Sequence, residues 1–430
     1  MRRLACILAS LALAALSGCA HSVSSAPRPL TTAAEPGAEQ RAPVTILVSI
    51  DGFRADYLQR GLTPTLAGLA ADGVSAAMIP SFPTKTFPNH WAAVTGYYPD
   101  NSGITANSFS DPARPDPKDR FTMASLDPFY WNAKEPLWVT AEKAGIRTAA
   151  MFWPGSAVAW GGQIKPRAYG RTEGGTRPAD WQAFDQNISP EQRVNAVLDW
   201  LRRPAAIRPK LLFLYFDEVD TAGHESGPDG ADIGPALRNV DRDIAMLLEG
   251  LAALGQPANI VITADHGMAE TSTERTIALD TILSPGDYTL DEGGPYATLI
   301  AKPGREATLE AKLLRPHDHM QCWRKEAIPA RFQYGTNPRI PPYLCLAETG
   351  WQIFPSKSLD QRIGGNHGYD NRAAEMRALF IANGPAFRQG AMVPSFENVD
   401  LNPLLRRVLG LPADSAMDGK LAPVLGALAD

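Results

Sequence analysis

Three unbroken apolar runs in this chain end in acidic residues. They are VTILVSIDG at 44–52, KLLFLYFDEVD at 210–220 and ANIVITADHG at 258–267. Runs of this length, without alternating polar positions, are typical of strands buried on both faces, as in a parallel sheet between helices. We therefore expect three core strands with carboxylates at their carboxyl ends.

Segments with helical periodicity lie between and beside these runs. They are EPLWVTAEKAG at 135–145, SPEQRVNAVLDWLRR at 189–203 and GPALRNVDRDIAMLLEGLAALG at 234–255. Strands that alternate with helices predict an α/β fold, with a doubly wound, mostly parallel sheet flanked by helices. We expect one large domain over residues 44–430.

The N-terminal residues, MRRLACILASLALAALSGC, combine two arginines with a short apolar run. The run is too short to span a bilayer comfortably and has the length of a signal-peptide core. Its ending, Leu-Ser-Gly-Cys at 16–19, resembles the lipobox of bacterial lipoproteins. We expect a lipoprotein signal peptide at 1–18, a lipid anchor on Cys19 that holds the protein to a membrane, and export to the bacterial cell envelope, as a periplasmic or outer-membrane protein. A plain secretory signal cleaved nearby is the alternative.

Residues 19–43 are rich in Ala, Ser, Pro and Glu and lack periodicity, which predicts a flexible tether. In an oxidising compartment the two remaining cysteines, Cys322 and Cys345, are expected to form a disulfide. Zinc binding by this pair is the alternative, although neither cysteine belongs to a CxxC motif.

The chain has 430 residues, 44% of them hydrophobic, and a net charge of −5. This composition supports a large core but gives no basic surface for stable nucleic-acid binding. An anionic substrate would therefore need local positive charge, which metal ions can supply.

The acidic strand ends have histidines near them. Asp51, Asp220 and Asp265 should meet at the carboxyl edge of the sheet, where α/β proteins bind ligands. His224 follows Asp220 at i+4, His266 adjoins Asp265, and His367 lies in the glycine-rich segment IGGNHGYDN. A single acidic residue at a strand end is commonly a turn former, but three that converge indicate a site.

Carboxylate and imidazole ligands without thiolates suit Zn²⁺ or, less specifically, Mn²⁺ or Fe²⁺. Six such ligands and a threonine oxygen would serve two ions roughly 4 Å apart, the arrangement of two-metal phosphoryl transfer.

The segment SFPTKTFPNHWAAVTGYYP, at 81–99, could supply that threonine. Prolines at 83 and 88 restrict the backbone around Thr84 and Thr86, and either hydroxyl could act as a nucleophile. The structural alternative is a helix start that is capped by Asn89.

The other histidines have different settings. We expect a structural role for His90, next to the helix start, and a solvated side chain for His21 in the tether. His317 and His319, in RPHDHM, have metal-like spacing and form a rival site without the strand-end context.

Several segments together resemble the nucleotide pyrophosphatase/phosphodiesterase family of the alkaline phosphatase superfamily. They are VSIDGFRADYL, FPTKTFPNHWAAVTGYYPDNSGITAN, EPLWVTAEKAG, FWPGS, LYFDEVDTAGHESGP, VITADHGM and GNHGYDN. The resemblance runs from about residue 44 to ENVDLNPLLRRVLGLP near the C-terminus, and TKTFPNH followed by DxxxH, DHG and HGYDN is a highly specific combination.

The resemblance implies an alkaline-phosphatase-like fold, two zinc ions and Thr86 as the nucleophile. One zinc would be held by Asp220, His224 and His367, and the other by Asp51, Asp265, His266 and the Thr86 oxygen. Asn107 matches an asparagine that binds a phosphate oxygen. Phe87 and Tyr215 match positions that stack on a nucleobase, and either Trp181 or Phe184 would close that pocket. Asn366 departs from the family, which often has an aspartate there.

We therefore expect a dizinc phosphodiesterase or pyrophosphatase that releases a nucleoside 5′-monophosphate through a phosphothreonine intermediate. One alternative is a phosphate monoesterase, or a phospholipid or phosphonate hydrolase, of the same superfamily. A sulfatase is disfavoured because neither candidate nucleophile in 81–99 is a Cys or Ser in a C/S-x-P-x-R motif. The alternative from another class is a zinc-binding surface lipoprotein without turnover, whose zinc affinity would survive Thr86→Ala.

Overall fold

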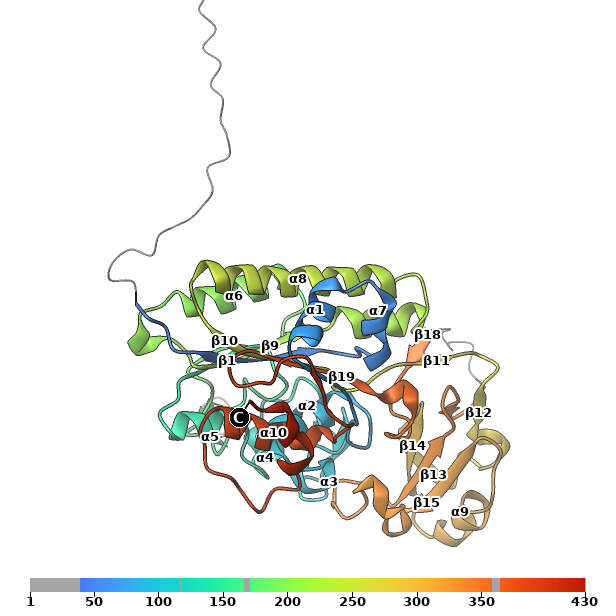
Figure 1. The fold of residues 1–430 in the computed structure, drawn as a ribbon. Helices are drawn as coiled ribbons and strands as arrows, with labels where there is room; N and C mark the ends of the chain where they lie inside the picture. Colours follow the sequence, from blue (N-terminus) through green and yellow to red (C-terminus); the bar gives the residue numbers. More distant parts are fainter. Residues whose placement is uncertain (1–38, 117, 166–170, 358–363, 430) are drawn as a thin grey trace, which may run out of the picture. The chain divides into compact units, whose positions relative to one another are not determined.

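The computed structural model describes residues 39–116, 118–165, 171–357 and 364–429 (Figure 1). The predicted signal peptide, Cys19 and most of the predicted tether lie outside these residues. Arg41 donates a hydrogen bond of 2.9 Å to the carbonyl oxygen of Leu201, so the chain contacts the folded domain just before its first strand. No helix in the described part of the chain is both long and apolar enough to cross a bilayer.

A mostly parallel sheet forms the centre of the domain (Figure 1). Within the described residues its strand order is β20-β2-β19-β10-β1-β9-β5-β8, and β19 is the strand that runs antiparallel to both of its neighbours. The strands are β1 (Val44–Ile50), β2 (Val74–Met78), β5 (Thr148–Met151), β8 (Asp180–Gln182), β9 (Leu211–Phe216), β10 (Ala258–Thr263), β19 (Ala378–Asn383) and β20 (Ala391–Met392).

The three predicted core strands are the middle of this sheet. Strand β1 pairs in parallel with β10 on one side and β9 on the other, so that Val48 is opposite both Ile262 and Leu214. Every residue of β1 and β9 is buried, because helices cover both faces. The parallel register brings the carboxyl ends of all three strands to one edge.

Helices α1, α6, α7 and α8 lie on one face of the sheet, and α2, α4, α5 and α10 lie on the other (Figure 1). Their bounds are α1 Pro64–Asp72, α2 Thr86–Thr95, α3 Pro99–Ser102, α4 Pro128–Trp131, α5 Leu137–Lys143, α6 Pro190–Leu201, α7 Glu218–Ser226, α8 Ile233–Ala253, α9 Glu306–Leu313 and α10 Leu401–Val408. The predicted α/β fold and its predicted helices are confirmed.

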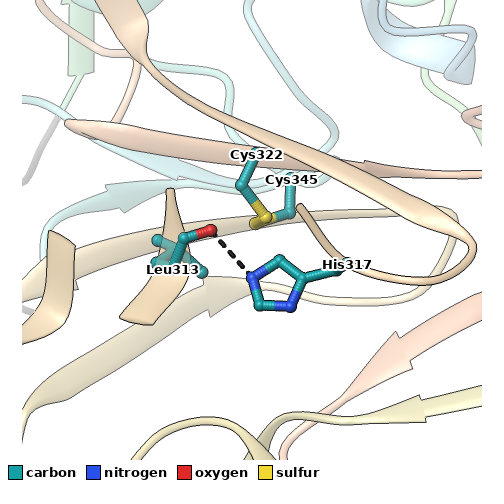
Figure 2. Close-up of a disulfide and its surroundings, with 4 residues drawn as sticks. All are labelled: Leu313, His317, Cys322 and Cys345. Atoms are coloured by element: carbon teal, nitrogen blue, oxygen red, sulfur yellow. Dashed lines mark hydrogen bonds between the residues drawn. A yellow bond between two sulfur atoms is a disulfide. The ribbon is translucent and has the colours of Figure 1, made fainter. Parts of the chain in front are cut away.

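A smaller antiparallel sheet with its own hydrophobic core adjoins the main one. Its order is β13-β14-β16-β15, from β13 (Tyr288–Glu292), β14 (Tyr296–Ala301), β15 (Met320–Arg324) and β16 (Tyr343–Ala347). A disulfide joins Cys322 and Cys345, which face each other across β15 and β16 (Figure 2).

The remaining described strands form short pairs. They are β3 (Phe109–Ser110) with β4 (Arg120–Phe121), β6 (Gln163–Lys165) with β7 (Arg171–Glu173), β11 (Ala269–Thr271) with β18 (Gly364–Asn366), and β12 (Thr276–Ala278) with β17 (Gln352–Phe354). The β11–β18 pair matters for function because His367 directly follows β18.

Candidate active site

Side chains from five segments meet at the carboxyl edge of the main sheet. Asp51 follows β1, Asp265 and His266 follow β10, Asp220 and His224 lie on α7, His367 follows β18, and Thr86 begins α2. The short turns after β1 and β10 leave little freedom in where the first carboxylates point. The topology therefore assembles residues that are far apart in the sequence.

One group consists of Asp51, Asp265 and His266, all of them buried. The Nε2 atom of His266 lies 2.9 Å from Asp265 Oδ2 and 3.5 Å from Asp51 Oδ1. The backbone N–H of Gly52 donates to Asp265 Oδ1 at 3.2 Å, which leaves Oδ2 facing the histidine. These three ligand atoms are close enough together to share one metal ion.

The predicted ligands of the second ion, Asp220, His224 and His367, also lie together, and Asp220 and His367 form a candidate metal group with His266. The Nε2 atoms of His224 and His367 lie 3.1 Å apart, and they lie 3.4 and 3.6 Å from the carboxylate oxygens of Asp220. The side chain of His224 is 39% exposed, so this group faces solvent. The two groups are contiguous, because the rings of His266 and His367 stack with centroids 3.5 Å apart.

The backbone fixes the orientation of all three histidines. The Nδ1 atoms of His224, His266 and His367 donate to the carbonyl oxygens of Gly365, Gly267 and Thr84 at 2.9, 2.9 and 2.8 Å. A carbonyl can only accept, so Nδ1 carries the proton and Nε2 presents a lone pair to the cluster. This is the arrangement expected of histidines that ligate a metal.

Burial penalises the charged form of the carboxylates in the cluster. Buried oxygens Oδ1 of Asp51, Oδ1 of Asp220 and Oδ2 of Asp265 have no hydrogen-bond partner in the described structure. Burial, helped by Asp265 and Asp220, raises the pKa of Asp51 well above its usual range, and burial raises the pKa of Asp265 to about 8. A cation removes this penalty, so the oxygen and nitrogen donors fit the predicted metal site.

The two candidate threonines have different settings. Thr86 Oγ1 lies 3.5 Å from His266 Nε2, at the cluster. Thr84 is fully buried, where its hydroxyl donates to the carbonyl oxygen of Tyr369 at 3.2 Å and accepts from the N–H of Gly368 at 2.8 Å. Thr84 therefore holds the segment that carries His367, and Thr86 is free to act in chemistry.

The alternative of a helix start capped by Asn89 is wrong, because α2 begins at Thr86 and its N-cap is Lys85. The Asn89 side chain instead accepts from the N–H of Ser81 at 2.7 Å and donates to the carbonyl oxygens of Pro83 and Lys85. These bonds brace the turn that carries Thr86.

His90 has the predicted structural role. It is buried and donates from Nδ1 to the carbonyl oxygen of Thr86 at 2.8 Å, while Ser49 Oγ donates to its Nε2 at 2.8 Å. Burial lowers the pKa of His90 to about 3, so the imidazole is neutral.

Asn107 and Phe87 lie beside the nucleophile. Asn107 Oδ1 accepts the backbone N–H of Phe87 at 2.9 Å, which leaves the amide NH₂ group to donate elsewhere. Phe87 is half-buried and packs against Phe121 and Trp131, with ring centroids 6.0 Å apart in both pairs. Both residues are thus rigidly mounted.

Tyr215 has a different role from the predicted base stacking. Its side chain is only 6% exposed, its ring packs edge-on against His90 and Phe184, and its hydroxyl donates to Asp51 Oδ2 at 2.5 Å. With so little of the side chain exposed, the ring cannot stack on a base. The hydroxyl instead holds Asp51 so that Oδ1 faces His266, a contact that the apolar run around Tyr215 did not reveal.

Removing this hydroxyl should weaken metal binding. For Tyr215→Phe we expect roughly tenfold lower metal affinity at the Asp51 group, since outer partners of metal ligands contribute about that much. Competition with a fluorescent chelator measures the affinity. Unchanged affinity in a folded variant would contradict the role in positioning Asp51.

Of the two aromatic candidates for the pocket, Phe184 lies by the cluster. Its ring is 57% exposed and lies 6.0 Å from that of Tyr215 and 5.5 Å from that of Phe152. Trp181, 41% exposed, instead packs under the guanidinium of Arg177 at 5.0 Å.

The rival histidine pair does not form a metal group among the described residues. His317 donates to the carbonyl oxygen of Leu313 at 3.0 Å (Figure 2), and His319 donates to Glu348 at 2.8 Å and stacks on Trp351. His317 also lines a cavity of about 540 Å³ that contains none of the predicted site residues.

Asn366 hydrogen-bonds to the backbone of His367 and not to its imidazole. Its Oδ1 accepts the backbone N–H of His367 at 2.9 Å and its amide donates to Gln352 at 3.0 Å. It therefore braces the backbone, while Thr84 orients the imidazole.

Residues 45–370 match the family described as type I phosphodiesterase / nucleotide pyrophosphatase. Over 371 residues the chain is 36% identical to human ectonucleotide pyrophosphatase/phosphodiesterase family member 5. This match covers 86% of the chain and 74% of the human protein. The chain is 37% identical over 376 residues to the Xenopus laevis bis(5′-adenosyl)-triphosphatase of the same family, which covers 86% of this chain and 78% of that protein.

Solved structures of relatives have the same fold. Human family member 5 superimposes with a TM-score of 0.82 at 33% identity and covers 90% of this chain and 100% of its own. Murine member 5, in an inactive variant with a threonine replaced by alanine and in complex with AMP, has a TM-score of 0.83 at 33% identity and the same coverage. The chain therefore belongs to the type I phosphodiesterase/nucleotide pyrophosphatase family of the alkaline phosphatase superfamily, and is a hydrolase of phosphodiester or pyrophosphate bonds.

Proposed function

We propose that this protein is a dizinc nucleotide phosphodiesterase/pyrophosphatase that forms a phosphothreonine intermediate on Thr86 and releases a nucleoside 5′-monophosphate. The observation that carries the proposal is the position of Thr86 Oγ1, 3.5 Å from His266 and next to two contiguous groups of carboxylates and Nε2 lone pairs. A nucleophile beside two cation sites is the constellation of in-line phosphoryl transfer.

In this proposal the ligands are divided between two zinc ions. Asp51, Asp265, His266 and the Thr86 oxygen would hold one, and Asp220, His224 and His367 the other. Bound there, the ions supply Lewis-acid stabilisation of the attacking and leaving oxygens.

The chain's own residues perform the remaining steps. Thr86 gives up its hydroxyl proton to solvent, and its Oγ bonds to phosphorus as the bond to the leaving oxygen breaks and an alcohol or pyrophosphate departs. Water then adds to phosphorus, breaks the bond to Oγ and returns the hydroxyl to Thr86, with release of the monophosphate. The Asn107 amide, oriented by the N–H of Phe87, donates to a non-bridging oxygen of the phosphoryl group.

Two aromatic side chains near the cluster, one half-buried and one exposed, suit a nucleobase. Phe87 follows the nucleophile, and Phe184 lies beyond Tyr215 at the same edge of the sheet. The AMP complex of the murine relative supports a nucleotide as the substrate. We therefore assign the open aromatic position to Phe184 rather than to Trp181.

Replacing Phe184 with alanine should raise KM for a nucleotide substrate by about tenfold, because one stacked base contributes about 1–3 kcal/mol. The matched variant Trp181→Ala should change KM less than about twofold. Steady-state kinetics with a nucleoside triphosphate compares them, and a larger effect of Trp181→Ala would reverse the assignment.

The products of a nucleoside triphosphate test the reaction class. We expect the 5′-monophosphate and pyrophosphate, separated by ion-exchange chromatography. Formation of the diphosphate and phosphate would instead indicate a monoesterase, and no product from protein that binds zinc would indicate a binding protein without turnover.

We also propose export and anchoring through Cys19, on the strength of the N-terminal sequence alone. Incorporation of labelled palmitate in a bacterial host, and its loss in Cys19→Ala, would test this.

A further inference from the structure

Lys85 precedes the nucleophile and is the N-cap residue of α2. It is only 9% exposed, yet its ammonium forms no hydrogen bond or ion pair with any residue that the structure describes. Its nearest aromatic contact, Tyr296, lies 5.9 Å from Nζ. Most of the side chain is thus out of solvent with no protein partner for its charge, so an anionic group of the ligand would complete its surroundings.

The side chain of Lys85 passes over the segment that carries His367. A Cβ atom added to Gly368 would lie 2.9 Å from Lys85 Cε and 3.3 Å from Nζ. Burial lowers the pKa of Lys85, and the charges of Glu292 and Asp220 oppose this. The ammonium therefore lies on the Asp220–His224–His367 side of the cluster.

This is the side of the leaving group. Thr86 Oγ1 approaches phosphorus from the Asp51–Asp265–His266 side, next to His266. In-line displacement places the attacking and leaving oxygens on opposite sides of phosphorus. The leaving oxygen and whatever it carries must then face Asp220, His224 and Lys85.

We propose that Lys85 determines specificity by binding a phosphate of the leaving group, so that the enzyme prefers pyrophosphate bonds over phosphodiesters with an uncharged alcohol. This inference rests on the proposed function. In a nucleoside triphosphate or a dinucleoside polyphosphate, the leaving oxygen is bonded to a second phosphorus, whose non-bridging oxygens are anionic. An alcohol offers no such charge.

Other charges adjoin the same position. Glu292 ends β13, and Asp291 beside it accepts from Arg120 at 3.0 Å, while Arg120 also donates to Ser108 at 3.0 Å. The charge of Lys85 lowers the pKa of Glu292, which burial raises. The charges of Glu292 and Lys85 influence each other without forming an ion pair, and Glu292 by itself would repel a polyphosphate.

Two substrates that share a nucleotidyl group and differ only in the leaving group test this role. Thymidine 5′-triphosphate and the p-nitrophenyl ester of thymidine 5′-monophosphate both yield thymidine 5′-monophosphate. For Lys85→Met we expect kcat/KM to fall by about 10- to 100-fold for the triphosphate, the range for one charged hydrogen bond, and by less than about threefold for the ester.

The ester reaction is the folding control for Lys85→Met, and Lys85→Arg, which keeps the charge, should retain the preference for the triphosphate. Equal losses on both substrates, or no loss on either, would overturn the role of Lys85. A wild-type enzyme that hydrolyses neither substrate would overturn the proposed function as well, whereas normal wild-type hydrolysis with an unchanged ratio in Lys85→Met overturns this inference alone.

A second variant leaves Lys85 in place. Glu292→Gln removes the nearby negative charge and should raise the ratio of kcat/KM for the triphosphate to that for the ester by a few-fold. A ratio that stays the same or falls would contradict the placement of the leaving phosphate beside Lys85.

Discussion

Replacing Thr86 with alanine is expected to lower kcat for a nucleotide diester by about 10⁴-fold or more, the loss typical of removing a covalent nucleophile. The Oγ1 atom of Thr86 lies 3.5 Å from His266 Nε2 and is the atom that would bond to phosphorus. The histidine and carboxylate ligands remain, so zinc content should stay close to that of the wild type. Steady-state rates, together with metal analysis of the same preparation, test both parts.

Thr84→Ser is the matched control for this substitution. It keeps the hydroxyl that donates to Tyr369 and accepts from Gly368, so its activity should stay close to that of the wild type. If Thr86→Ala kept more than about one hundredth of the wild-type rate, a covalent role for Thr86 would be contradicted. An enzyme that has lost its nucleophile keeps a far smaller fraction of its rate.

Replacing His367 with alanine should be nearly as damaging, with a loss in rate of about a thousandfold or more, since one metal centre stabilises the transition state by several kcal/mol. His367 Nε2 lies 3.1 Å from that of His224, and its ring stacks on His266. In the proposed dizinc site, the substitution removes a ligand of one ion and the packing of a ligand of the other. Zinc content should fall from two ions per chain to about one or fewer.

Inductively coupled plasma mass spectrometry after gel filtration gives the zinc content. His317→Ala is the control, because His317 contacts Leu313 at the edge of the smaller sheet and lies outside the cluster. Full zinc occupancy and activity in His367→Ala would show that this histidine is not a ligand. Loss of zinc in His317→Ala would point to the rival site.

Local sequence patterns predicted the strands that build the site. The apolar runs that became β1, β9 and β10 are buried on both faces, and burial of this kind leaves a direct trace in composition. The parallel sheet then brings Asp51 and Asp265 together without further information. The family resemblance selected Thr86 over Thr84, which the residues alone left open.

What the sequence did not reveal depends on tertiary contacts. Tyr215 lies in a continuous apolar run, and nothing local distinguishes a core tyrosine from one whose hydroxyl reaches Asp51, 164 residues away in sequence. Asn89 looked like a helix cap because it precedes an apolar stretch, but its side chain instead closes the preceding turn onto Ser81. Lys85 packs closely against Gly368, which is distant in sequence and comes near it only in the folded chain.

The most direct test of a metal-dependent nucleotide phosphodiesterase compares two nitrophenyl substrates in one preparation. The p-nitrophenyl ester of thymidine 5′-monophosphate and p-nitrophenyl phosphate are assayed before chelation, after chelation and after zinc is added back. We predict a strong preference for the diester that disappears with the metal and returns with zinc. Preference for the monoester, or diester hydrolysis that survives complete removal of metal, would contradict the account.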